Sequence, residues 1–186
     1  DYCPELQTRK PEMMRLAVSF GQGLQMTNIL KDIWDDRRRG ACWLPADVFA
    51  QRGVQLGTLK PGDVAADFED GLGQLIAIAH GHLRNALRYT VMLPRSEVGI
   101  RKFCLWALGM AVLTLRKLDK NRNFSNSQDV KISRRSVTAT VVSTNITVRS
   151  NLALKALFAL VSAGLPQREV NAPVPDPIDQ SESRVV

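Results

Sequence analysis

Cysteine and histidine are scarce in this sequence, and their scarcity excludes several kinds of site. The 186 residues include three cysteines, Cys3, Cys42 and Cys104. They are odd in number and far apart, and they include no CxxC pair, so no disulfide framework is indicated. The two histidines, His80 and His82, stand roughly 200° apart on a helix and cannot bind one metal ion together. We therefore expect Cys104 to be a core residue and the histidines to have surface or packing roles.

A targeting signal and a long apolar run are also missing. The chain begins Asp-Tyr-Cys-Pro, without an initiator Met, a basic segment or an apolar segment of the kind that opens a signal peptide. This abrupt start predicts a fragment of a longer protein. The longest nearly uncharged stretch, residues 103–115, is shorter than the roughly 20 apolar residues that a membrane span needs. It predicts a buried helix.

Basic residues outnumber acidic ones, which gives a formal net charge of +7 and a pI of about 9.7. Such a balance suits phosphates, nucleic acid or an anionic membrane surface, and it equally suits a well-solvated surface. The basic residues are scattered and aromatic residues between them are sparse, which argues against a nucleic-acid partner.

Sustained strand-like alternation is scarce and internal repeats are absent, so the sequence predicts an all-α fold. A helical domain is expected over residues 1–165. A disordered tail is expected over residues 166–186, where prolines and then a polar run leave little apolar surface to bury. The helices are expected at residues 11–38, 47–52, 61–92, 96–118, 130–143 and 150–165, with Asp63 and Ser96 as N-caps.

One stretch carries a pattern of polar residues with helical spacing. Gln25, Asn28, Asp32 and Asp36 fall along one narrow stripe of a helix, which Met14, Val18, Gly21 and Ile29 continue as an apolar face. A carboxylate buried on such a face without a partner costs several kcal/mol. A bound cation removes that cost. Asp35 points away from the stripe and is a weaker candidate ligand.

Two aspartates one helical turn apart can bind Mg²⁺, which takes oxygen ligands and completes its shell with water and substrate phosphates. The ions then neutralise a diphosphate leaving group. Gln25 and Asn28 can hydrogen-bond diphosphate oxygens or metal-bound water, and the arginines at 37–39 can add positive charge. The alternative is a plain helix end, at which Asp35 and Asp36 pair with the nearby arginines.

The window GLQMTNILKDIWDDRRRGACWLP resembles the second aspartate-rich region of the squalene and phytoene synthase family. The family pattern QxxNxxxDxxxD is matched at Gln25, Asn28, Asp32 and Asp36. The resemblance implies an isoprenoid synthase-type helical bundle that joins two prenyl diphosphates head to head. It also implies a first aspartate-rich motif on earlier helices, which would lie before Asp1.

A second block resembles the squalene synthase branch of this family. It consists of Phe103-Cys104, Met110-Ala111 and Val130-Lys131-Ile132. The resemblance implies that the helix containing Phe103, Cys104 and Met110 lines a prenyl cavity, to which we also assign Phe20 and Gly21. It further implies that the Val-Lys-Ile segment, followed by two arginines, binds the phosphates of NADPH. That cofactor role is carried to Lys131, Arg134 and Arg135.

The resemblance implies condensation of two farnesyl diphosphates to presqualene diphosphate and NADPH-dependent reduction to squalene. Three alternatives stay open: a synthase that forms phytoene, dehydrosqualene or presqualene diphosphate; an inactive fragment; and, in a different class, a basic helical module that binds nucleic acid or a membrane surface. A cytoplasmic protein is expected, with a peripheral membrane location because the substrate and product are lipids.

Overall fold

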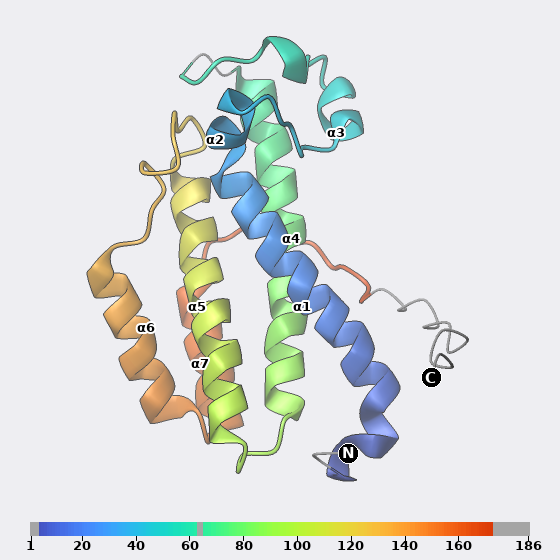
Figure 1. Cartoon of the computed structure of the whole chain (residues 1–186), viewed down its shortest axis with the longest axis vertical. Coiled ribbons are helices and arrows are strands. Elements are labelled where there is room, and N and C mark those ends of the chain that lie inside the picture. The colour runs from blue at the N-terminus through green and yellow to red at the C-terminus, as the bar shows by residue number, and fades with distance from the viewer. Residues whose placement is uncertain (1–3, 63–64, 173–186) are drawn as a thin grey trace, which may run out of the picture.

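The computed structural model describes residues 4–62 and 65–172, and within these ranges the regular secondary structure is entirely helical. Long helices run roughly alongside one another to form a bundle, and the short helices between residues 33 and 58 cover one of its ends (Figure 1). The helices are η1 Pro4–Arg9, α1 Lys10–Lys31, α2 Ile33–Arg38, α3 Ala46–Ala50, η2 Leu56–Thr58, α4 Ala66–Met92, α5 Val98–Lys120, α6 Arg134–Thr147 and α7 Asn151–Val161. The all-α prediction is confirmed.

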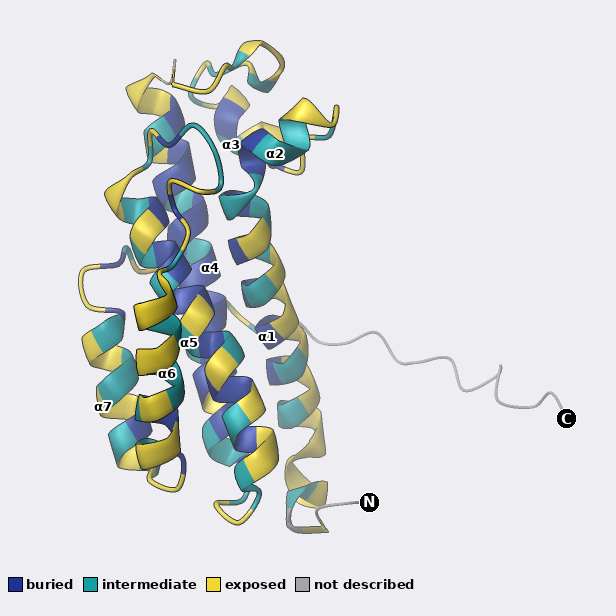
Figure 2. Ribbon diagram, turned by 60° about the vertical axis from the view of Figure 1, so that its left-hand side comes forward, coloured by how far each residue is buried: buried dark blue, intermediate teal, exposed yellow. Residues whose placement is uncertain are grey.

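Helix α4 is the centre of the bundle and is buried on most of its surface, whereas α1 and α6 have exposed outer faces (Figure 2). It packs closely on α1, where a Cβ added at Gly23 would lie 2.9 Å from Leu83 Cδ2. A buried polar contact lies in the same interface: Ser19 Oγ and His82 Nδ1 are hydrogen-bonded at 2.8 Å, and Asn85 Nδ2 donates to Ser19 Oγ at 3.0 Å. His82 therefore has the expected packing role.

The glycines of α4 permit close contacts on several sides. A Cβ at Gly71 would lie 2.6 Å from the ring of Phe49, and one at Gly73 would lie 2.4 Å from Arg122 Nη1. Each glycine costs a helix interior about 1 kcal/mol relative to alanine. These contacts explain why that cost is tolerated.

The end of the bundle that carries the aspartates has an aromatic core. Trp34 of α2 is 1% exposed and packs against Phe68 and Phe124, with ring centroids 6.0 and 6.4 Å away. Phe68 also stacks on Phe49 of α3 at 5.2 Å. This cluster fixes α2, and hence the aspartate motif, on the end of α4.

A fully buried arginine ties together two helix ends at the other end of the bundle. The Arg101 guanidinium donates to the backbone oxygens of Thr90, Leu93 and Val148 at 3.2, 2.7 and 2.8 Å, and to Asn151 Oδ1 at 2.6 Å. Those carbonyls belong to the C-terminal ends of α4 and α6, where the helix dipole favours a cation. The charge is thus stabilised by helix ends.

An extended segment follows α7 and crosses α4. Pro166 O lies 3.0 Å from His80 Nδ1, and Val170 O accepts a hydrogen bond from Asn85 Nδ2 at 3.3 Å. Gly81 makes room for the segment, since a Cβ there would lie 2.5 Å from Arg168 O. The first part of the predicted tail, residues 166–172, is therefore packed on the bundle, and the rest of it lies outside the described residues.

Several predicted helix boundaries were wrong. The helix expected over residues 11–38 is interrupted at Asp32, where φ is −98° and ψ is 11°. α4 begins at Ala66 instead of residue 61, and the predicted cap Asp63 lies outside the described residues.

The predicted starts of the next two helices also differ from those in the structure. Glu97, not Ser96, precedes α5. The helix expected at 130–143 begins only at Arg134, because Ser133 caps it by accepting a hydrogen bond from Ser136 N.

Length and composition alone would allow α5 to cross a membrane, although 44% of its most apolar window is buried within the fold. Its contacts with α1, α4, α6 and α7 account for the buried part of that window. The prediction of a buried helix over residues 103–115 was wrong for Phe103, Trp106 and Met110, which are exposed.

Candidate functional site

The two aspartates of the motif keep the spacing of one helical turn across the break between α1 and α2. Asp32 N donates to Asn28 O at 2.9 Å, and Asp36 N donates to Asp32 O at 2.8 Å. The backbone hydrogen-bond ladder therefore continues through the interruption. Asn28, Asp32 and Asp36 follow one another at single-turn intervals, as the stripe predicted.

Neighbouring cations only partly neutralise these carboxylates. Lys31 Nζ lies 3.3 Å from Asp32 Oδ2, and Arg39 Nη1 lies 3.9 Å from Asp36 Oδ1. The Asp32 and Asp36 side chains are 34% and 22% exposed. Partly exposed pairs of this kind contribute up to about 1 kcal/mol. Such weak partners leave carboxylate oxygens free for a stronger one.

Asp32 and Asp36 can supply two of the ligands of a Mg²⁺ ion, but not its whole coordination shell. Mg²⁺ is usually bound by one or two protein carboxylates and takes its other ligands from water and substrate phosphates. No group of three or more His, Cys, Asp or Glu residues able to hold a metal lies within residues 4–62 and 65–172. Asp32 and Asp36 would thus hold the ion together with the substrate or with residues elsewhere in the protein.

The other charged residues of the motif differ in how strongly they are engaged by neighbouring groups of the protein. Asp35 pairs with Arg38, as the alternative of a plain helix end predicted. Arg37 donates to the backbone oxygens of Leu56 and Gly57 and holds the loop before α4. Arg39 is 78% exposed at the side chain. Arg39, which lies 3.9 Å from Asp36 Oδ1, is therefore the arginine of this group best placed to add positive charge beside the aspartates.

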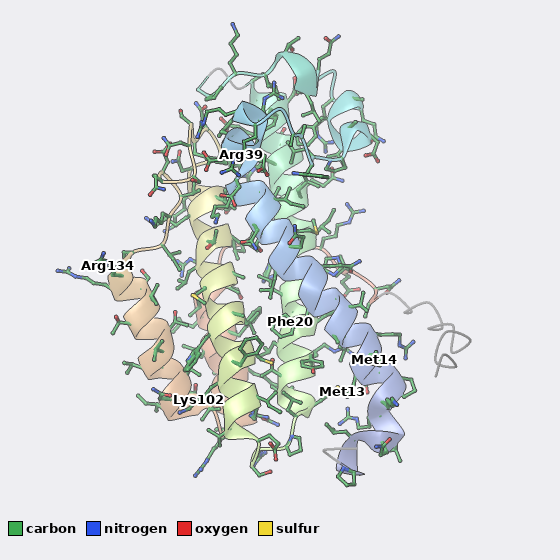
Figure 3. All side chains as sticks on the ribbon, viewed as in Figure 1. Met13, Met14, Phe20, Arg39, Lys102 and Arg134 are labelled. Carbon is green, nitrogen blue, oxygen red and sulfur yellow. The ribbon has the colours of Figure 1, made fainter. Side chains whose placement is uncertain are left out.

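The stripe that carries the aspartates is open to solvent in this chain. Met14 and Val18 are 40% and 36% exposed, and a Cβ built on Gly21 would meet no atom within 4 Å. Gln25 and Asn28 are also exposed. The expectation that this stripe of α1 is buried was therefore wrong within the part of the chain that the structure describes. Figure 3 shows Met14 and Arg39 toward opposite ends of this stripe.

A second open apolar surface lies on α5, which contacts α1 and lies beside it in Figure 1. Phe103 is 71% exposed, and Met110 and Trp106 are each 37% exposed. The resemblance to the squalene synthase branch assigned Phe103 and Met110 to a prenyl cavity but did not include Trp106. The signal for Trp106 was its spacing: residues 103, 106 and 110 recur at helical intervals on one face.

Two other predicted cavity residues lie in the core. Phe20 is 8% exposed and packs against Tyr89 of α4, with ring centroids 5.9 Å apart. Cys104 is 4% exposed, and burial raises the pKa of its thiol. Both side chains support the helices beneath the open surface.

The predicted cofactor-binding residues Lys131, Arg134 and Arg135 are exposed and lie before and within the first turn of α6. The Arg134 side chain points away from the bundle (Figure 3). No salt bridge joins these residues to the part of the chain that the structure describes. The segment presents an accessible cluster of positive charge at a helix N-terminus.

Comparison with known proteins identifies relatives for most of this chain. The family model described as squalene/phytoene synthase matches residues 3–136. The bifunctional protein CrtB/UppS of Streptomyces coelicolor is 31% identical over 100 residues, which cover 54% of this chain and 17% of that protein. The phytoene synthase of Thermus thermophilus is 34% identical over 107 residues, 57% of this chain and 34% of that enzyme. The phytoene synthase of Cereibacter sphaeroides is 30% identical over 98 residues, 53% of this chain and 25% of that enzyme. The matches thus cover between 17% and 34% of these relatives. No solved structure matches the chain significantly.

Proposed function

This chain belongs to the squalene/phytoene synthase family, and from that membership we propose that the protein containing it is a prenyltransferase that joins two prenyl diphosphates head to head. Among the reactions of this family we favour a phytoene-type condensation, which needs no hydride donor. The relatives named phytoene synthase support this choice over the squalene reaction expected from the sequence.

The observation that carries the proposal is the geometry of Asp32 and Asp36. Their carboxylates lie one turn apart, partly exposed and weakly paired, on a stripe that Gln25 and Asn28 extend. Mg²⁺, when bound there, supplies positive charge that stabilises a departing diphosphate. The aspartates hold the ion, while Gln25 and Asn28 orient the diphosphate oxygens by donating hydrogen bonds.

The open apolar surfaces of α1 and α5 suit the hydrocarbon part of the substrate. Loss of a diphosphate leaves an allylic cation, which water destroys unless the site excludes it. Met14, Phe103 and Met110 would form one wall of a dry cavity, and the remainder of the protein would supply the opposite wall. Aromatic faces such as Phe103 stabilise a nearby cation by about 0.5–2 kcal/mol.

The second candidate within the family is the NADPH-dependent formation of squalene from farnesyl diphosphate. The accessible Lys131, Arg134 and Arg135 favour it, because arginine and lysine at a helix N-terminus suit the phosphates of a dinucleotide. In this case Lys131→Ala and Arg134→Ala would block reduction while the NADPH-independent condensation continued.

The test uses the full-length protein that contains this chain, because the matches cover only part of the relatives. It would be incubated with farnesyl or geranylgeranyl diphosphate and Mg²⁺, with and without NADPH, and the products identified by mass spectrometry. We expect a condensed hydrocarbon whose formation does not respond to NADPH. Squalene formed only with NADPH would establish the second candidate. No Mg²⁺-dependent consumption of any prenyl diphosphate would refute the enzyme proposal.

Matched aspartate variants test the assignment of the site. Asp32→Asn and Asp36→Asn should each lower the condensation rate at least about 100-fold, because each removes charge that stabilises the transition state. Asp35→Asn is the control, since Asp35 is engaged with Arg38, and it should retain most activity. Equal losses in all three variants would contradict the assigned roles.

We further propose that the protein is cytoplasmic and associates peripherally with the membrane that stores its lipid product. Sedimentation with anionic vesicles should then weaken as salt increases, because basic surface residues would carry the attraction. Tight, strongly salt-dependent binding to DNA, without any prenyl diphosphate turnover, would instead support the nucleic-acid-binding alternative.

A further inference from the structure

The end of the bundle opposite the aspartates carries apolar side chains that the proposed reaction does not use. Leu152 and Ile146 are 80% and 78% exposed, which makes them the two most exposed large apolar residues in the part of the chain that the structure describes. They stand in the first turn of α7 and the last turn of α6. Ile100, in the first turn of α5, is 41% exposed. Single apolar residues on a surface are normal, but a group of them marks an interaction site.

The hydrogen bonds of Arg101 show that these residues belong to one end of the bundle. Its guanidinium donates to Val148 O and Asn151 Oδ1 at 2.8 and 2.6 Å, so the start of α5 meets the turn between α6 and α7. Ile100 precedes Arg101 in the chain, and Leu152 follows Asn151. Figure 1 shows this junction at the end of the bundle away from α2 and α3.

Three exposed cations flank this apolar group, and they form no salt bridge with any residue that the structure describes. Acidic residues are scarce at this end, since residues 92–105 and 142–156 include only Glu97. The charge of the surface is therefore positive and uncompensated. We define the basal face as the cations and the apolar residues together, namely Arg95, Arg149, Lys155, Ile100, Ile146 and Leu152.

This composition fits a lipid surface better than a protein partner. The core of a protein interface is depleted of charged residues, and lysine in particular is rare there. Binding in the interfacial region of a membrane instead combines exposed leucine and isoleucine with lysine and arginine, because anionic headgroups attract the cations. The charge of the basal face is thus complementary to an anionic bilayer.

We propose that the basal face docks the protein on an anionic phospholipid bilayer, with its apolar side chains between the lipid headgroups and its cations on the lipid phosphates. The inference rests on the peripheral membrane association proposed above and names the surface that produces it. On α5, Ile100 stands one turn before Phe103, so the basal face adjoins the open apolar surface. Asp32 and Asp36 lie at the far end of the bundle. A diphosphate held there stays in water, while the hydrocarbon chain along α1 and α5 points toward the bilayer.

Binding of the full-length protein to vesicles of phosphatidylcholine and phosphatidylglycerol, measured by flotation, tests the apolar part of the face. Leu152→Gln should weaken binding at least about tenfold, because it removes an apolar side chain from the lipid. Leu160→Gln is the matched control, since Leu160 is 72% exposed near the other end of the same helix, and it should bind normally. Unchanged melting temperatures show that both variants are folded.

The charged part of the face is tested in the same assay. Arg149→Ala should weaken binding about fivefold, as expected for one cation beside an anionic surface, and the difference should vanish on vesicles of phosphatidylcholine alone. Lys120→Ala is the control, because Lys120 is exposed at the opposite end of α5. It should bind like the unaltered protein.

A phospholipid that carries a diazirine in its acyl chain gives the location directly. We expect its label, mapped by mass spectrometry, on the first turn of α5 and on residues 146–152. A protein that binds no vesicles would overturn the membrane association and the basal face together. Equal weakening by Leu152→Gln and Leu160→Gln would overturn the basal face alone. Lipid label confined to other surfaces, as when the rest of the protein or a second copy covers this one, would do the same. Turnover of prenyl diphosphates without vesicles tests the enzyme proposal separately.

Discussion

Replacing Arg101 by methionine should destabilise this bundle more than replacing any exposed arginine. The guanidinium is 0% exposed and makes four hydrogen bonds, three of them to backbone carbonyls at the ends of α4 and α6. Methionine retains much of the hydrocarbon but leaves those carbonyls without donors. Each buried group left unpaired costs about 1–3 kcal/mol, partly offset because a buried charge is also removed. We expect a net loss of about 3–5 kcal/mol.

Urea denaturation of the full-length protein, followed by far-ultraviolet circular dichroism, measures this loss. The transition of Arg101→Met should move to much lower urea with little change in slope. Arg95→Met, an exposed arginine in the adjacent turn, is the control and should shift the free energy of unfolding by less than about 0.5 kcal/mol. Arg101→Lys should fall between them, because it keeps the charge but loses the planar fork. A loss in Arg101→Met no larger than that in Arg95→Met would refute the role of the helix ends.

Two further perturbations test the packing of α4. Gly71→Ala should destabilise the protein by about 1–3 kcal/mol because its Cβ would overlap the Phe49 ring. Gly99→Ala is the control: a Cβ there would meet no atom within 4 Å, so the protein should keep its stability or gain up to about 1 kcal/mol. Equal shifts in melting temperature for the two variants would contradict this prediction. Acid should also destabilise the fold, because burial lowers the pKa of His80 and His82 below 6.5. The unfolded chain then binds more protons, so stability is complete above about pH 6.5 and falls below it. Urea midpoints at pH 7 and pH 5 measure the effect, and it should shrink in His80→Phe.

The parts of the fold that follow from local chemistry could be predicted from the sequence. Helical periodicity located the long helices, and the spacing of Asn28, Asp32 and Asp36 correctly placed them one turn apart. The close contacts at Gly71 and Gly73 also follow a local rule, because a glycine in a helix interior usually has a packing reason.

Features that depend on residues distant in sequence could not be predicted. The break at Asp32 leaves the ladder of backbone hydrogen bonds nearly intact. No proline or glycine stands at this position to mark the break in the sequence. Arg101 stands in an amphipathic helix like many surface arginines, and only the meeting of two helix ends around it makes it structural. The openness of the Met14 face likewise reflects which neighbours are present, which periodicity alone does not reveal.

The extended segment across α4 constrains the order in which this bundle can be completed during synthesis. His80 meets a carbonyl that lies 86 positions later in the chain, and Asn85 meets one 85 positions later. Contacts of such long range form late, because a long loop must close before they add any stability. On a ribosome, α1, α4 and α5 emerge long before Val170. The face of α4 around Gly81 therefore stays uncovered until the last part of the described chain has been made, and covering it is a final step of folding.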